Sequence, residues 1–152
     1  MRRTLLLLFT TMAVALVLGA GMAWAAPGAP TVVRTVPPEG ATNVALDAHI
    51  KAKFSEAMKY RTINTNTFYL TVGGCTSECL RVPAEVRYHG DTKTAILDPT
   101  APLAPNTQYT ATVEGAGDTD QQAVTDRELT PMASDYTFSF TTGSGGGGPG
   151  RP

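Results

Sequence analysis

Hydrophobic and polar side chains alternate along several short stretches of this chain. In residues 49–54 the apolar side chains of Ile50, Ala52 and Phe54 fall on one face, and polar side chains fall on the other. Three more stretches have this period of two, and the last has an aromatic residue at every second position: 68–72, 109–113 and 136–140. Such a period is expected of antiparallel strands that bury one face. The alternation therefore predicts an all-β protein.

Turn-forming residues separate these stretches. Prolines and glycine at 37–40 end a first expected strand over 31–36, and residues 89–91 separate 86–88 from a strand over 94–97. After residue 25 there is no helical periodicity, and residues 56–63 are the one place for a helical turn. The spacing predicts an Ig-like or fibronectin-III-like antiparallel β-sandwich of about seven strands.

A corner marked by proline leads into one of the expected strands. It runs from Leu103 through Pro105 to Tyr109. This layout is typical of the tyrosine corner of Ig-like sandwiches. The Tyr109 phenol is expected to hydrogen-bond backbone a few residues upstream while its ring packs into the core.

Residues 68–72 are predicted to form a hairpin with a returning segment that runs through 80–82 and on to 86–88, with Cys75 and Cys79 at the tip. In an exported chain, two cysteines most simply form a disulfide. Redox or metal-ligating thiols are the alternative, but residues 73–80 contain no histidine and no further cysteine. Pro83 has no backbone donor, so we expect an edge position or an irregularity there.

The N-terminal segment has the layout of an export signal over residues 1–25. Two arginines precede an apolar run from Leu5 to Met22, and small residues favour cleavage after Ala25. An uncleaved anchor is the alternative, because the run approaches the roughly 20 residues that span a bilayer. We expect a secreted or cell-surface domain over 26–142 and a flexible, glycine-rich tail over 143–152. Membrane attachment is expected only if the signal is kept.

Charge argues against nucleic acid as a partner. The chain has 12 Lys and Arg against 13 Asp and Glu, and a net charge of −1. Loss of the two signal arginines leaves about −3. No basic cluster is evident along the sequence, so a nucleic-acid-binding role is not predicted.

Candidate catalytic residues are few. His49 falls on a polar strand face and His89 in a turn, and neither belongs to an H-E-x-x-H motif. No serine lies in a G-x-S-x-G elbow. Glu56 has no evident partner carboxylate for acid–base chemistry. We therefore predict no enzyme activity and no resident cofactor.

The segment 115–135 is the best candidate for binding. Asp118, Asp120 and Asp126 are candidate calcium ligands, and Glu128 offers a further carboxylate in the same loop, although the spacing does not match an EF-hand. A loop of this length is usually functional or mobile, and an unimportant insertion is the alternative. Tyr60 and Tyr69 are the candidates for stacking on sugar rings, because they lie off the core face.

Three short motifs support a family resemblance. They are residues 36–44, the Phe-Ser-Glu-Ala-Met sequence at 54–58, and the corner at 103–109 together with residues 136–142. In their order and spacing the chain resembles the bacterial Ig-like domain found in the surface-layer protein SbsA. The resemblance covers nearly all of the chain after the signal, but 115–135 departs from the family pattern and the cysteine hairpin looks like a local addition.

The resemblance implies an exported β-sandwich that serves as a spacer, scaffold or interaction module, without catalytic residues. Four residues are expected to be structural: Phe54, Met58, Leu103 and Tyr109. The leading hypothesis is a non-catalytic module that binds an unknown protein or cell-envelope component. The alternative is a calcium-responsive or glycan-binding accessory module that uses 115–135.

Overall fold

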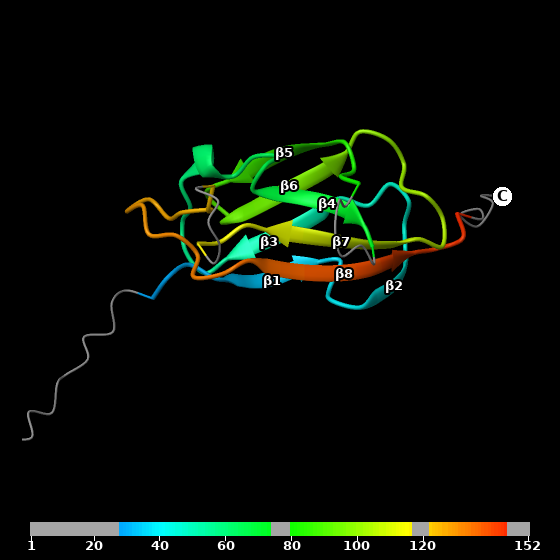
Figure 1. Ribbon diagram of the computed structural model, residues 1–152, viewed down its shortest axis with the longest axis horizontal. Helices are drawn as coiled ribbons and strands as arrows, with labels where there is room; N and C mark the ends of the chain where they lie inside the picture. The colour runs from blue at the N-terminus through cyan, green and yellow to red at the C-terminus, as the bar shows by residue number, and fades with distance from the viewer. Residues whose placement is uncertain (1–27, 74–79, 117–121, 146–152) are drawn as a thin grey trace, which may run out of the picture.

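A computed structural model describes residues 28–73, 80–116 and 122–145. The predicted signal, the predicted Cys75–Cys79 disulfide, the two candidate ligands Asp118 and Asp120, and most of the predicted tail lie outside these residues. Within them, the structure is a sandwich of two four-stranded sheets (Figure 1). The predicted all-β sandwich is confirmed.

The two sheets contain eight described strands and one short 3-10 helix, η1 (Tyr60–Thr62). Sheet A has the order β1 (Val32–Val36), β3 (Ile50–Phe54), β6 (Thr94–Pro99) and β5 (Ala84–His89). Sheet B has the order β2 (Ala41–Val44), β8 (Tyr136–Thr142), β7 (Gln108–Val113) and β4 (Phe68–Val72). The helix lies inside the segment where the sequence allowed a helical turn.

The sequence predicts antiparallel pairing throughout, but sheet B contains both parallel and antiparallel pairs. β2, which the alternation did not reveal, runs parallel to β8 at the edge of this sheet. Gly40 N donates to Ser139 O at 2.8 Å, and Gly143 N donates to Val44 O at 2.8 Å. After the turn at 37–40, the chain thus passes from the edge of sheet A to the edge of sheet B.

The predicted hairpin is present for its returning segment 80–82, where Thr71 and Arg81 form an antiparallel bridge, and wrong for 86–88, which belongs to the other sheet. β4 pairs with β7 in sheet B, and β5 pairs with β6 in sheet A. Between them the chain returns briefly beside β4, where Val82 N donates to Leu70 O at 2.8 Å. The next residue, Pro83, has no N–H to continue this pairing, and from there the chain enters sheet A.

The inner faces of the two sheets form one apolar core. The side chains of Ile50, Ala52 and Phe54 are at most 1% exposed, as their alternation predicts. Tyr109 and Phe140 stack in this core with ring centroids 5.9 Å apart. The burial of such side chains stabilises the fold by roughly 1.5–3 kcal/mol for each large residue.

Two tyrosine hydroxyls tie backbone to the core. At the predicted corner, Ala104 N donates to the Tyr109 hydroxyl at 2.9 Å, which is the contact expected from the sequence. Elsewhere, Met58 N donates to the Tyr88 hydroxyl at 2.9 Å. Leu103 and Met58 are themselves 3% and 2% exposed, so both residues lie in the core.

The described residues contain no helix of the length and apolarity needed to cross a membrane.

Replacing Tyr109 with phenylalanine is expected to destabilise the protein by about 1 kcal/mol, because the Ala104 N–H loses the acceptor that the buried Tyr109 side chain provides. The free energy of unfolding, measured in urea, tests this. Tyr60→Phe is the matched control, since Tyr60 is 63% exposed and its loss of a hydroxyl should change little. Equal stability of the Tyr109→Phe variant and the wild type would contradict the structural role of the corner.

Candidate functional site

The outer faces of the two sheets differ in charge. In the described strands, every charged residue belongs to sheet A, and the strands of sheet B have none. The outward positions of sheet B are mainly hydroxyl-bearing: Thr71, Thr110, Thr112, Thr137, Ser139 and Thr141. The outer face of sheet A is therefore the part of the strand framework that can attract an ionic partner.

The register of sheet A arranges its outward side chains in rows across the strands. One row contains Arg34, Lys53, Thr94 and His89, and the next contains Val36, Lys51, Ile96 and Arg87. Neighbouring strands lie about 4.8 Å apart, and rows lie about 6.8 Å apart along a strand. The four cations of these two rows are called the basic face here: Arg34, Lys51, Lys53 and Arg87.

Three of these cations have no acidic partner among the described residues. Arg34 lies directly opposite Lys53 in the β1–β3 pair, and Lys51 follows Lys53 on the same face of β3. The two ion pairs found among the described residues both involve Asp98, and neither includes Arg34, Lys51 or Lys53. Like charges placed directly opposite each other destabilise a sheet. The basic face is thus a local concentration of positive charge within a chain of net negative charge.

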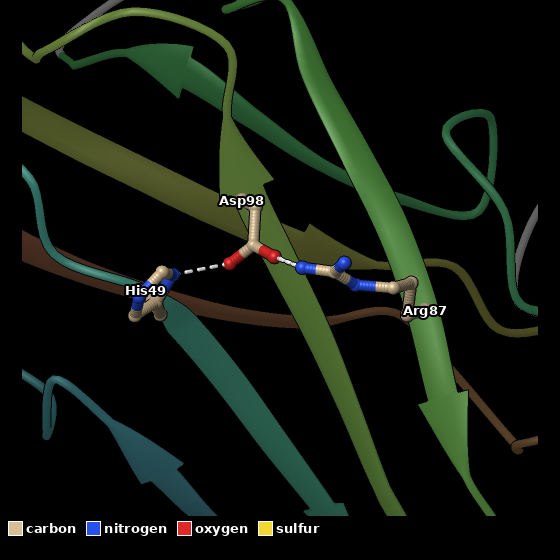
Figure 2. A network of polar contacts seen from close by, with 3 residues as sticks. All are labelled: His49, Arg87 and Asp98. Atoms are coloured by element: carbon tan, nitrogen blue, oxygen red, sulfur yellow. Dashed lines mark hydrogen bonds and ion pairs between the residues drawn. The ribbon is translucent and has the colours of Figure 1, made fainter.

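The two acidic residues of sheet A, Glu85 and Asp98, lie opposite each other in a further row. The Asp98 carboxylate contacts Nδ1 of His49 with one oxygen and Nη2 of Arg87 with the other, as Figure 2 shows. Its side chain is 14% exposed, whereas those of His49 and Arg87 are 64% and 60% exposed. Asp98 therefore balances the charge of Arg87 and leaves the other three cations of the basic face unpaired.

A histidine–aspartate pair also raises the question of catalysis. A hollow of about 260 Å³ adjoins this pair, and no serine or cysteine lines it. Its one hydroxyl-bearing residue, Thr100, donates to Pro83 O at 3.2 Å. The described residues thus do not complete a nucleophile–histidine–carboxylate arrangement at His49. His49 lies on the polar face, where the sequence places it, and His89 lies at the end of β5.

A group of three carboxylates lies near the described end of 115–135. Glu56, Asp126 and Glu128 each have an oxygen within 4.8 Å of the others. Asp126 is 5% exposed and accepts a hydrogen bond from Thr130 N at 2.7 Å. Glu56, which has no partner in the sequence pattern, reaches this group because the chain at Met58 pairs with Asp126. Carboxylate oxygens are suitable ligands for a hard cation such as calcium.

The segment 115–135 is more ordered in its described part than a structureless loop. Val124 is fully buried and Met132 is 3% exposed. Thr125 and Pro131 form an isolated antiparallel bridge. The sequence missed this anchoring because the buried residues are too far apart to produce an alternating pattern.

Tyr69, one of the two candidates for sugar stacking, has one face of its ring covered by Arg81. The Arg81 guanidinium carbon lies 3.7 Å from the ring centroid. The Tyr69 hydroxyl donates to Glu114 Oε1 at 2.6 Å. Partial burial raises the pKa of the Tyr69 phenol above its ordinary value of 10.0, and the Glu114 carboxylate raises it further. Tyr60 is the more accessible of the two, at 63% exposed.

The basic face is the feature that sequence reasoning missed. Its residues lie at positions 34, 51, 53 and 87, so no cluster is visible along the chain. The alternating Lys51 and Lys53 were a partial signal, because both were expected on the polar side of one strand. Their neighbours could be known only from the order and register of the strands.

Comparisons with known structures support the same fold. PcoC, a methionine-rich copper resistance protein from Escherichia coli, is similar with a TM-score of 0.57 and 22% identity, over 75% of this chain and 98% of PcoC. The N-terminal part of the bacterial S-layer protein SbsC is similar with a TM-score of 0.52 and 20% identity, over 76% of this chain and 24% of that structure. At these identities the likeness concerns the fold alone.

No curated protein sequence matches the chain. Residues 26–142 match the family model described as "Bacterial Ig-like domain". The strand pairing, the tyrosine corner and this match agree, and the chain belongs to the bacterial Ig-like domain family.

Proposed function

We propose that this protein is a non-catalytic module, secreted or held at the bacterial surface, that binds a protein or cell-envelope partner through one face of its sandwich. The observation that carries the proposal is the separation of charge between the sheets. A spacer needs charge mainly for solubility, for which mixed charges spread over the surface suffice. Here the charged strand residues are confined to sheet A, which favours recognition by that face.

The family and the fold support a surface role. Bacterial Ig-like domains and S-layer fragments such as SbsC are non-enzymatic in general. The predicted export signal over 1–25 agrees with an extracellular or envelope location. Within the family, a module of the SbsA surface-layer type is the assignment that the three sequence motifs favour.

The methionines do not support a copper role like the one named for PcoC. Thioether sulfur is a soft ligand that suits copper(I). In the described residues the methionines are Met58 and Met132, and both are buried, at 2% and 3% exposed. Their side chains pack in the core and are not available at the surface.

The protein is expected to cosediment with envelopes of the producing bacterium and to stay in the supernatant without them. The measurement is the fraction of purified protein that pellets with washed envelopes. An exported protein of similar size and net charge serves as the control. If the fraction of the protein that pellets is no larger than the fraction of this control, the proposed envelope partner is wrong.

Calcium response is a second candidate function, favoured by one observation. Glu56, Asp126 and Glu128 place three carboxylates within 4.8 Å. The partly buried position of this group would make repulsion between the carboxylates costly, and a divalent cation would relieve it. Asp126 and Glu128 belong to the carboxylates that the sequence offers in this segment, and Glu56 was not expected among them.

Calcium at millimolar concentration is expected to raise the melting temperature if this group binds it, because a ligand of the folded state stabilises that state. A gain of about 2.7 kcal/mol corresponds to a concentration 100-fold above the Kd. The Glu56→Gln/Glu128→Gln variant should lose the response, and Glu85→Gln, an exposed carboxylate on sheet A, should keep it. An unchanged melting temperature of the wild type at millimolar calcium would exclude the group as a calcium site.

A further inference from the structure

The unpaired cations of sheet A form a compact, flat array. Arg34 and Lys53 lie on adjacent strands, and Lys51 lies one row away. By the spacing of strands and rows, neighbouring positions of this array are about 5–7 Å apart. Lys51 is half-buried, and Arg34 and Lys53 are exposed. The array can therefore contact several negative groups of one extended partner at the same time.

The arrangement has a cost that points to a ligand. Arg34 and Lys53 repel each other across the β1–β3 pair, and no described carboxylate relieves them. A single glutamate at either position would turn this repulsion into an attraction. The chain could easily avoid this repulsive pair, and the pair lies on the sheet whose strands carry the charged residues. Binding of an anionic partner would explain why both cations are present.

We propose that the basic face of sheet A binds an anionic polysaccharide of the cell envelope, with Arg34, Lys51 and Lys53 as the contact residues. This inference rests on the proposed function and names the chemistry of the partner. The cations contact carboxylate or phosphate groups along the polymer. In the second row, Ile96 lies between Lys51 and Arg87, and Val36 lies beside Lys51 at the sheet edge; both offer apolar surface to the sugar rings.

The chemistry of the face favours a polysaccharide over other polyanions. Single-stranded nucleic acid is usually bound by stacking its bases on aromatic side chains. None of the outward residues in the two cationic rows is a phenylalanine, tyrosine or tryptophan. A membrane surface is usually bound by long apolar side chains beside the cations. The apolar residues of the two rows are Val36 and Ile96, which are short and, for Ile96, half-buried.

Affinity electrophoresis in gels that contain polygalacturonate tests the inference. The protein should be retarded by polygalacturonate but not by neutral dextran. The retardation should weaken as salt is raised towards 0.15 M, where the Debye length falls to about 8 Å. Retardation that is equal in both polymers, or insensitive to salt, would overturn the proposal.

Two triple variants with the same change in net charge locate the site. Arg34→Gln/Lys51→Gln/Lys53→Gln should weaken polygalacturonate binding about tenfold, the result of losing three charge contacts at the surface. Lys59→Gln/Arg61→Gln/Arg127→Gln removes three cations elsewhere and should bind as the wild type does. Equal weakening by both sets would mean that net charge, and not the basic face, attracts the polymer.

The Arg34→Glu variant separates binding from folding. It replaces the repulsive pair with Lys53 by an attractive pair, so its melting temperature should rise by about 2 °C. Its affinity for polygalacturonate should fall at the same time. A variant that is more stable yet binds less cannot owe its lost binding to unfolding. Undiminished binding by this variant would contradict the proposed contact.

Two further assays test whether the basic face binds a membrane surface or a nucleic acid instead. Vesicles of phosphatidylglycerol and phosphatidylcholine, and a single-stranded oligonucleotide, replace polygalacturonate in cosedimentation and gel-shift assays. Preferential binding of either would overturn the assignment to a polysaccharide. If the wild type and the Arg34→Gln/Lys51→Gln/Lys53→Gln variant pellet equally with envelopes, the basic face is not the contact, although the proposed function stands. Binding to polygalacturonate without binding to envelopes would contradict the proposed function and the envelope origin of the polymer, but not the attraction of the basic face for an anionic polysaccharide.

Discussion

The packing of two sheets against each other is the interaction on which the rest of this structure depends. Each strand must direct every second side chain into the shared core, and many of these positions are taken by residues that are at most a few per cent exposed, such as Phe54, Phe68 and Phe140. Because the period of a strand is two, the same packing assigns the remaining side chains to the outside. Core burial thus determines which residues are available to a partner without determining their chemistry.

The magnitudes explain how an unfavourable surface can persist on this framework. Burial of one large apolar side chain contributes roughly 1.5–3 kcal/mol. A cross-strand pair on the surface changes stability by roughly 0.2–1 kcal/mol. The repulsion between Arg34 and Lys53 is therefore small beside the contribution of the core. The outer face of sheet A can depart from the most stable composition, whereas Phe54 on the inner face of the neighbouring β3 cannot.

Local patterns predicted much of the fold, and non-local pairing accounts for what they missed. The alternation at 49–54 and the corner ending at Tyr109 depend on neighbours in sequence, and both predicted features are present. The placement of 68–72 and 86–88 in different sheets depends on which strands pair across long separations in sequence. The alternation of side chains does not indicate those pairings. For the same reason the sequence did not reveal the basic face or the approach of Glu56 to Asp126. Of the acidic residues expected in 118–128, Asp126 and Glu128 lie in the described residues, and Glu56 joins them from a distant position in the chain.

The parallel pairing of β2 with β8 has a mechanical consequence. The described chain enters the sandwich at one end and leaves it at the other (Figure 1). Tension between the two ends would pull these neighbouring strands in opposite directions along their length. All hydrogen bonds between the two strands would then carry the force at the same time. In a strand pair that is pulled apart from one end, the hydrogen bonds break one after another. A domain joined at both ends to a stretched envelope would resist force through this pair, independently of which partner its faces bind.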